Sequence, residues 1–206
     1  MSRIYKLIFL SFFILGCKPN VIKENKIIQR INNLDMNIFS MRGEKIYSIT
    51  SPYSIFDKNQ LKFQSKNTNI NIFNGEEIKY IISSEESTLS DNNKLLKLTG
   101  NVKLKIFKRD EDTLYADNFI WNIDETNYVL EGNIRFENKN IILNSSKAKL
   151  DSDNIIEFFN PVKYIIKDEN NENKYEITSE NAYYNLNTES ISFKSKDKRV
   201  KSIIYF

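Results

Sequence analysis

The sequence of 206 residues contains no histidine and a single cysteine, Cys17. Without histidine the chain lacks the commonest general base and the commonest metal ligand, and one cysteine cannot form an intramolecular disulfide. Zinc sites of the usual kinds and Ser-His or Cys-His catalytic pairs are therefore excluded. The sequence also carries no glycine-rich loop that would cradle a phosphate. We expect a protein that is not an enzyme and that binds no metal or cofactor.

Glycine and proline are scarce, at 5 and 3 residues, which excludes a collagenous chain or a flexible Pro-Gly linker. No apolar run reaches the roughly 20 residues that a membrane-spanning helix needs. The formal net charge is only +3, and the lysines are spread along the chain instead of clustered. Such a surface disfavours binding to nucleic acid. The length predicts one domain with its own core.

The first residues have the layout of a secretory signal. Arg3 and Lys6 precede the apolar run Leu7–Leu15, which is too short to span a membrane. The run ends in Ile-Leu-Gly-Cys at residues 14–17, which resembles the bacterial lipobox, whose cysteine is diacylated. We predict a signal peptide over residues 1–16, lipidation of Cys17 and a tether over residues 17–35. The alternative is an uncleaved anchor that contains Cys17.

A short motif is repeated in the second half of the chain. Leu98–Val102 reads Leu-Thr-Gly-Asn-Val, Leu130–Ile134 reads Leu-Glu-Gly-Asn-Ile, and Phe158–Val162 is a looser copy, Phe-Phe-Asn-Pro-Val. An alternation of apolar and charged residues follows each copy, as in a strand with one buried face. Gly-Asn and Asn-Pro pairs favour tight turns. We therefore predict a turn before each of these strands.

A second motif has an apolar residue, then a small or apolar residue two positions on, then a polar residue or proline. Its copies are Ile49–Pro52, Ile82–Glu85, Leu114–Asp117, Ile141–Asn144 and Ile177–Glu180. Polar turn residues and a short strand follow each copy, so the chain contains about five hairpin-like units. This spacing predicts an all-β fold, layered or coiled, over residues 36–206.

The alternation predicts which side chains face inward. Charged neighbours such as Lys103 and Arg135 fall on the opposite face. The inner face either packs as a dry core or is held slightly apart to accept acyl chains, and the pattern is compatible with both. The candidate lipid-contacting residues are Val102, Leu104, Ile106, Ile134, Phe136, Val162, Tyr164, Ile177 and Phe193. A last apolar segment, Ile203, Ile204, Tyr205 and Phe206, is a candidate edge strand for docking a partner.

The order of these motifs resembles the OstA family of lipopolysaccharide-export proteins, which includes LptA and LptC, and most of all its LptC-like members. Gly100–Val102 and Leu114–Asp117 match the family's most recurrent elements, and the early segment Phe39–Thr50 looks like the entry strand of LptC. The resemblance covers residues 36–206. It implies an open, twisted β-jellyroll, in which repeated antiparallel hairpins form a V-shaped pair of sheets around the acyl chains of lipid A.

The resemblance also implies partners. These are lipopolysaccharide, the subunits of an inner-membrane ABC exporter, and a periplasmic jellyroll bridge protein docked head to tail. Familiar LptC proteins carry a transmembrane helix, whereas this chain has a candidate lipid anchor at Cys17. We therefore expect a periplasmic lipoprotein, on the inner membrane in preference to the outer. The alternative is an envelope scaffold that uses the β-repeats only for contacts between proteins.

Overall fold

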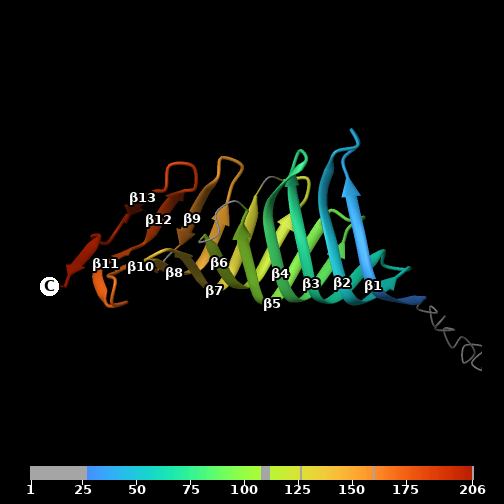
Figure 1. Ribbon diagram of the computed structural model, residues 1–206, viewed down its shortest axis with the longest axis horizontal. Coiled ribbons are helices and arrows are strands. Elements are labelled where there is room, and N and C mark those ends of the chain that lie inside the picture. Colours follow the sequence, from blue (N-terminus) through green and yellow to red (C-terminus); the bar gives the residue numbers. More distant parts are fainter. Residues whose placement is uncertain (1–26, 108–111, 126, 160, 206) are drawn as a thin grey trace, which may run out of the picture.

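The computed structural model describes residues 27–107, 112–125, 127–159 and 161–205. The predicted signal peptide, residues 17–26 of the predicted tether with Cys17, and Phe206 lie outside the described residues. The described part is an elongated β-structure with its first strand at one end and its last strands at the other (Figure 1). Within these residues no helix is long and apolar enough to cross a membrane.

The described residues form fourteen β-strands and no helix, which confirms the predicted all-β jellyroll. The strands are β1 (Ile28–Phe39), β2 (Lys45–Asp57), β3 (Lys62–Asn74), β4 (Glu77–Ser90), β5 (Leu95–Ile106), β6 (Thr113–Asn122), β7 (Tyr128–Asn138), β8 (Ile141–Leu150), β9 (Ile155–Phe159), β10 (Val162–Lys167), β11 (Asn173–Ser179), β12 (Asn181–Asn185), β13 (Ser190–Lys194) and β14 (Lys201–Ile204).

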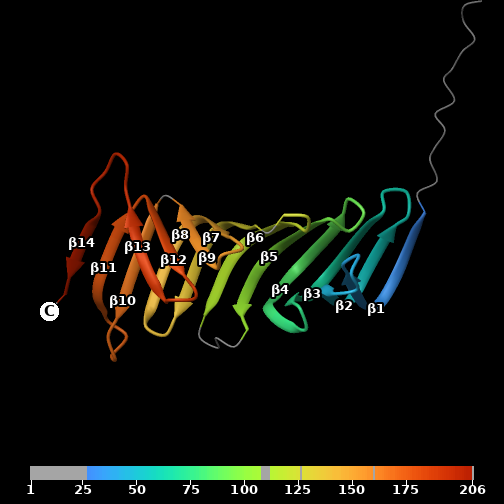
Figure 2. The ribbon, with the colours of Figure 1, turned by 90° about the horizontal axis from the view of Figure 1, so that it is seen from above.

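Strands β1 to β8 pair with their neighbours in chain order, and every pair is antiparallel. The sheet then forks at β8. The beginning of β8 pairs with β10, which is followed by β11 and β14. The end of β8 pairs with β9, which is followed by β12 and β13. Figure 2 shows the succession of strands along the length of the molecule.

The fork continues a division that already runs through the long strands. The registers of β4 to β8 are interrupted in mid-strand, for example between Glu131 and Ile134 of β7. We call these interruptions the corner line. Half I consists of the strand parts on one side of this line: the C-terminal parts of β1, β3, β5 and β7, the N-terminal parts of β2, β4, β6 and β8, and all of β10, β11 and β14. Half II consists of the other parts of β1 to β8 together with all of β9, β12 and β13.

The two Gly-Asn pairs lie on the corner line, so our prediction of a turn was wrong for these two copies, whereas the third copy does separate β9 from β10. Gly100 and Asn101 lie inside β5, and Gly132 and Asn133 lie inside β7. All four have positive φ, between +45° and +78°. A tight turn and a mid-strand bulge need the same left-handed backbone, and the flanking sequence alternates on both sides in either case. The pair therefore bends a continuing strand from one half to the other.

The second motif marks the corner on the even-numbered strands. Its last residues Pro52, Glu85 and Asp117 lie at corners, and Glu180 separates β11 from β12. The copy at Ile141–Asn144 is displaced, because Ile134 of β7 pairs with Ser145 and Glu131 with Lys147, which puts the corner at Ser146. Because residues 141 and 142 are both isoleucine, the sequence alternation does not show which of them faces inward, and the register cannot be read from it.

The structured part also begins earlier than residue 36. Residues 28–35, which we assigned to the tether, belong to β1 and pair with residues 50–57 of β2. This part of β1 is polar and mostly exposed because it is an edge strand with one hydrogen-bonded neighbour. Its composition therefore does not distinguish it from a tether.

The core lies between the two halves. Ring contacts join β2 to β6, β4 to β7, β7 to β12 and β10 to β13. In each of these four contacts a strand of half I packs over a strand further along half II, so the halves cross obliquely. Buried apolar side chains run without a break from Tyr47 in β2 to Tyr184 in β12.

Candidate lipid-contacting interior

The candidate lipid-contacting residues lie on the inner faces of the two halves. All but one belong to half I and are buried, whereas the charged neighbours Lys105, Arg135 and Lys163 are exposed. Phe193 belongs to half II and is partly buried against the core. Its ring meets that of Tyr164 across the interior at a centroid distance of 5.2 Å.

The facing wall in half II was largely missed by the sequence analysis. It is buried and rich in rings, and its main members are Leu96, Leu98, Phe119, Trp121, Tyr128, Leu130, Phe158 and Tyr184. Leu96 and Leu98 precede the Gly-Asn pair of β5, and Tyr128 and Leu130 precede that of β7. The same alternation therefore runs on both sides of each pair. Extending it backwards through the pair would have found these residues.

Carboxylates stabilise the bent backbone of β5 and β7. The Nδ2 atom of Asn133 donates to Oδ2 of Asp117 over 2.8 Å, and Asn101 donates in the same way to Glu85. Each carboxylate lies over the glycine that precedes its asparagine. A Cβ atom on Gly132 would lie 2.5 Å from Oδ2 of Asp117. The glycine, the asparagine and the acid therefore act as one unit at each of these two corners.

Serine hydroxyls span the corner in β2, β4 and β8 and at the junction of β11 and β12. Each donates to the carbonyl two residues further on, over 2.8 to 3.0 Å; the donors are Ser51, Ser84, Ser145 and Ser179. In β6 the equivalent residue is Ala116. A buried carbonyl without a partner is costly, so these hydroxyls stabilise the bend from inside.

The interior changes character along the molecule. Near the corners of β2, β3 and β4 the buried side chains are small and polar, and they satisfy one another. Ser54 donates to Ser65 over 2.7 Å, and the hydroxyls of Thr68 and Ser87 lie 2.9 Å apart. From β5 to β12 the interior is aliphatic and aromatic. The larger apolar surface therefore lies in the middle and C-terminal parts of the molecule.

Buried tyrosines lie on the side of the molecule opposite the corner line. Burial raises the pKa of Tyr128 to about 12, and it also raises the pKa values of Tyr47 and Tyr80 above the ordinary tyrosine value. A raised pKa means that the folded protein favours the neutral phenol. These hydroxyls are therefore hydrogen-bonding groups at ordinary pH.

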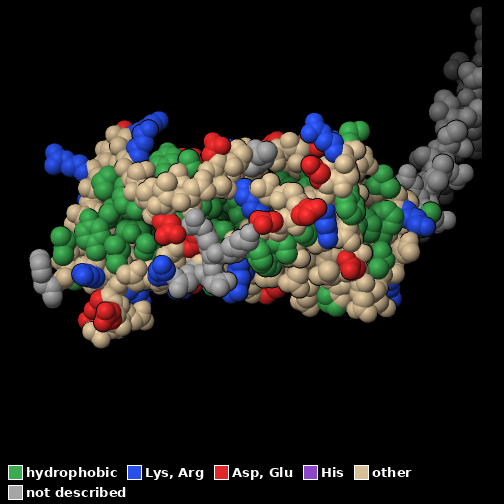
Figure 3. Space-filling view, turned by 45° about the horizontal axis from the view of Figure 1, so that its top comes forward, with side chains coloured by type: hydrophobic (Ala, Val, Ile, Leu, Met, Phe, Trp, Pro, Cys, Tyr) green, Lys and Arg blue, Asp and Glu red, His purple; other side chains and the backbone are tan. Residues whose placement is uncertain are grey.

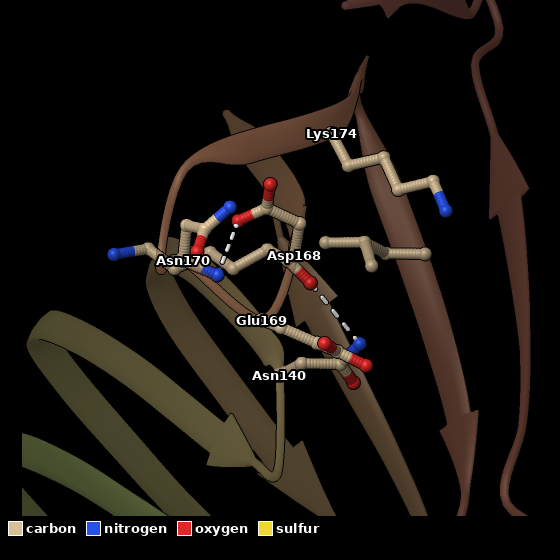
Figure 4. Close-up of a pocket in the computed structure, with 7 residues that line it drawn as sticks. Asn140, Asp168, Glu169, Asn170 and Lys174 are labelled. Atoms are coloured by element: carbon tan, nitrogen blue, oxygen red, sulfur yellow. Dashed lines mark hydrogen bonds between the residues drawn. The ribbon is translucent and has the colours of Figure 1, made fainter.

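A polar cavity of about 530 Å³ lies outside this interior, beside the loop between β10 and β11 (Figure 4). Asn140 donates to the carbonyl of Lys167 over 3.2 Å, and Oδ1 of Asp168 accepts from the backbone of Asn170 over 2.9 Å. These bonds account for the shape of the loop. Among the described residues no group of three or more acidic or cysteine side chains could hold a metal ion.

Both ends of the sheet carry exposed apolar side chains. Ile203 and Ile204 of β14 and the following Tyr205 are 45 to 58% exposed, and β14 has β11 as its hydrogen-bonded neighbour. At the other end Ile28 and Phe39 of β1 are about half exposed. Hydrophobic side chains gather towards both ends of the long axis in Figure 3.

The sequence profile of the family described as lipopolysaccharide-assembly, LptC-related, matches residues 9–152. The chain belongs to this LptC-related family. The match ends just after β8, where the sheet forks, so β1 to β8 carry the family pattern. Its members act in lipopolysaccharide assembly, which agrees with the resemblance seen in the sequence motifs.

Among solved structures, this LptC-related chain is similar to LptH of Pseudomonas aeruginosa, the LptA homologue described as the periplasmic component of the lipopolysaccharide transport device. The identity is 9%, the TM-score is 0.39, and the alignment covers 87% of this chain and 96% of LptH. A sequence comparison with curated proteins finds no match.

Proposed function

We propose that the protein carries lipopolysaccharide across the periplasm, holding the acyl chains of lipid A between halves I and II. It receives the lipid from an inner-membrane ABC exporter and passes it to a neighbouring jellyroll. Membership of the LptC-related family carries this proposal. The continuous apolar interior supports it, because transfer of acyl chains needs an apolar surface along the whole path. The contacting residues are those predicted above, from Val102 in β5 to Phe193 in β13.

The sheet edges are the docking points in this proposal. A strand with unpaired backbone groups can accept a strand of a partner. β14 offers such an edge with exposed Ile203 and Ile204, and exposed Tyr205 follows it. Phe206, the last residue of the predicted docking segment, lies outside the described residues. β1 offers another at the opposite end. A neighbouring jellyroll at one end and the exporter at the other would make the apolar path continuous.

The anchor in this proposal is a diacylated Cys17. We expect cleavage before Cys17 and acylation of its sulfur, because two acyl chains bind a membrane stably where one does not. Mass spectrometry of the mature N-terminus tests this, with Cys17→Ser as the control that keeps the precursor uncleaved. A mature protein that still begins at Met1, or an unmodified Cys17, would contradict the anchor and leave the transport proposal standing.

One observation favours a second function. The interior is filled by side chains, and Leu104, Leu114 and Phe136 have 0% exposure. A protein that served only as an envelope scaffold would need nothing more than this packed core. The two functions differ in whether lipid ever contacts the inner face.

Photocrosslinking in cells separates the two functions. A photoreactive phenylalanine analogue replaces Phe136 on the inner face, and the matched control replaces Arg135, the exposed neighbour on the same strand. Tyr164 and Lys163 form a second pair of the same kind. We expect lipopolysaccharide adducts from the inner positions and none from the outer ones. Adducts to proteins alone, from inner and outer positions alike, would establish the scaffold instead.

A further inference from the structure

Three hydrogen bonds join the two halves along the side opposite the corner line. The hydroxyl of Tyr47 in half I donates to the carbonyl of Asn93, in the turn between β4 and β5, over 3.2 Å. The hydroxyl of Tyr80 in half I donates to Oδ1 of Asn154, in the turn between β8 and β9, over 3.4 Å. Nδ2 of Asn138, at the end of β7, donates to the hydroxyl of Tyr184 in β12 over 3.3 Å. We call this row of bridges the tyrosine seam.

Ring contacts across the interior follow the same line. The Tyr47 ring meets Trp121 edge to face at 5.4 Å, and the Tyr80 ring meets Tyr128 at 5.5 Å. Further along, Phe136 meets Tyr184 at 4.8 Å. In each pair the first residue belongs to half I and the second to half II. The halves are thus held together here by contacts that each involve a side chain.

The corner line is held differently. In β5 and β7 the backbone itself runs from one half to the other through a glycine with positive φ. A covalent connection on one side and side-chain contacts on the other make the corner line the natural hinge. Parting the halves at the seam breaks non-covalent contacts, whereas the backbone of β5 and β7 keeps them joined at the corners.

A cavity lies beside one of the bridges. About 200 Å³ of space is lined by Tyr80, Ile106 and Phe107 of half I and by Asn154 and Leu186 from the half II side. Phe107 is 41% exposed at this place. The packing of the seam is therefore incomplete where the two halves meet, and an apolar chain end could begin to separate them here.

We propose that the tyrosine seam is a lateral gate, and that acyl chains enter and leave the interior when the seam opens along its length. The proposal rests on the proposed function, because it explains how an interior filled with side chains could admit a lipid. The rings that close the gate in the empty protein would then contact the acyl chains in the loaded one.

A cross-link tests the gate. Lys79→Cys and Asp153→Cys lie next to the bridging residues Tyr80 and Asn154, one in each half. The full chain with both substitutions is treated with a flexible bismaleimide, and uptake of fluorescent lipopolysaccharide is measured. We expect uptake to be lost. The matched control pair, Ile81→Cys and Lys105→Cys, links register partners within half I and should leave uptake unchanged.

Two further controls belong to this experiment. Modification of the Lys79→Cys and Asp153→Cys protein with a monomaleimide adds bulk without a link, and should permit uptake. The parent protein, whose one cysteine is Cys17, shows any effect of the reagent itself. Uptake at the parent rate by the cross-linked protein would overturn the gate and leave the proposed function intact. Absence of uptake by every form, the parent included, would overturn both.

Weakening the seam should increase the uptake of lipopolysaccharide, whereas the cross-link should abolish it. The double variant Tyr47→Phe with Tyr80→Phe keeps both rings and loses both bridging hydroxyls, and we expect uptake to rise roughly fivefold per hydroxyl removed. Tyr115→Phe is the matched control, because that hydroxyl bonds to Glu137 within half I. Uptake by the double variant no faster than that of Tyr115→Phe would overturn the gate.

Discussion

Gly100 and Gly132 show how single residues set the shape of this molecule. Each has a φ near +77°, and each lies beneath a carboxylate of the preceding strand. Glycine is needed at these positions for two reasons: its backbone adopts a positive φ without strain, and its missing side chain leaves room for the carboxylate. The sequence motif correctly singled out both pairs. It could not tell a bend within a strand from a turn between strands, because that difference depends on pairing with residues far along the chain.

We predict that Gly100→Ala lowers the free energy of unfolding by about 2–3 kcal/mol. The new Cβ atom would collide with Oε2 of Glu85 and lie 3.0 Å from its Cβ, in a backbone conformation that alanine rarely adopts. Gly75→Ala is the control, because its φ is +63° with no neighbour within 4 Å, and it should cost only about 1 kcal/mol. Urea unfolding measures both. Adding Glu85→Ala to Gly100→Ala removes the carboxylate but keeps the Cβ of residue 85, so it should recover part of the difference. A double variant no more stable than Gly100→Ala would contradict the steric account.

At the scale of elements, the sequence predicted where strands occur better than how they join. Alternation identified the half I parts of β5 and β7 and the start of β10, and the inner face follows from period two alone. The beginning of β1 was missed because an edge strand need not alternate clearly. The fork at β8 was also missed, since β9 and β10 are separated by the same kind of motif that bends β5 without breaking it.

The last strand tests the role of the sheet edge. Removal of residues 201–206 takes away a short exposed strand that pairs with β11, so we expect the free energy of unfolding to fall by less than about 1 kcal/mol. Capture of a jellyroll partner should be lost. The variant Ile203→Ser with Tyr205→Ser keeps the backbone edge and should retain part of the capture. Pull-down and circular dichroism measure binding and folding, and full capture by the truncated protein would contradict docking at β14.

At the scale of the whole molecule, the interior is both the core that stabilises the fold and the proposed path of the lipid. The same alternation describes a filled core and an open groove, so sequence alone left the two open. The structure shows a closed interior with rings from both halves in contact. Transport through it therefore requires the two halves to separate. The ionisation of the buried tyrosines on the side opposite the corner line can be used to follow that separation.

Alkaline pH should destabilise the closed molecule through these tyrosines. Burial raises the pKa of Tyr128 to about 12 from an ordinary value of 10.0. Because the raised pKa belongs to the folded state, the resulting stability is complete below pH 10 and is lost as the pH rises towards 12. We expect the urea midpoint to fall across this interval, and Tyr128→Phe to reduce the slope because one titrating group is gone. An equal slope in Tyr128→Phe and the parent protein would show that this buried phenol does not control the opening of the folded chain.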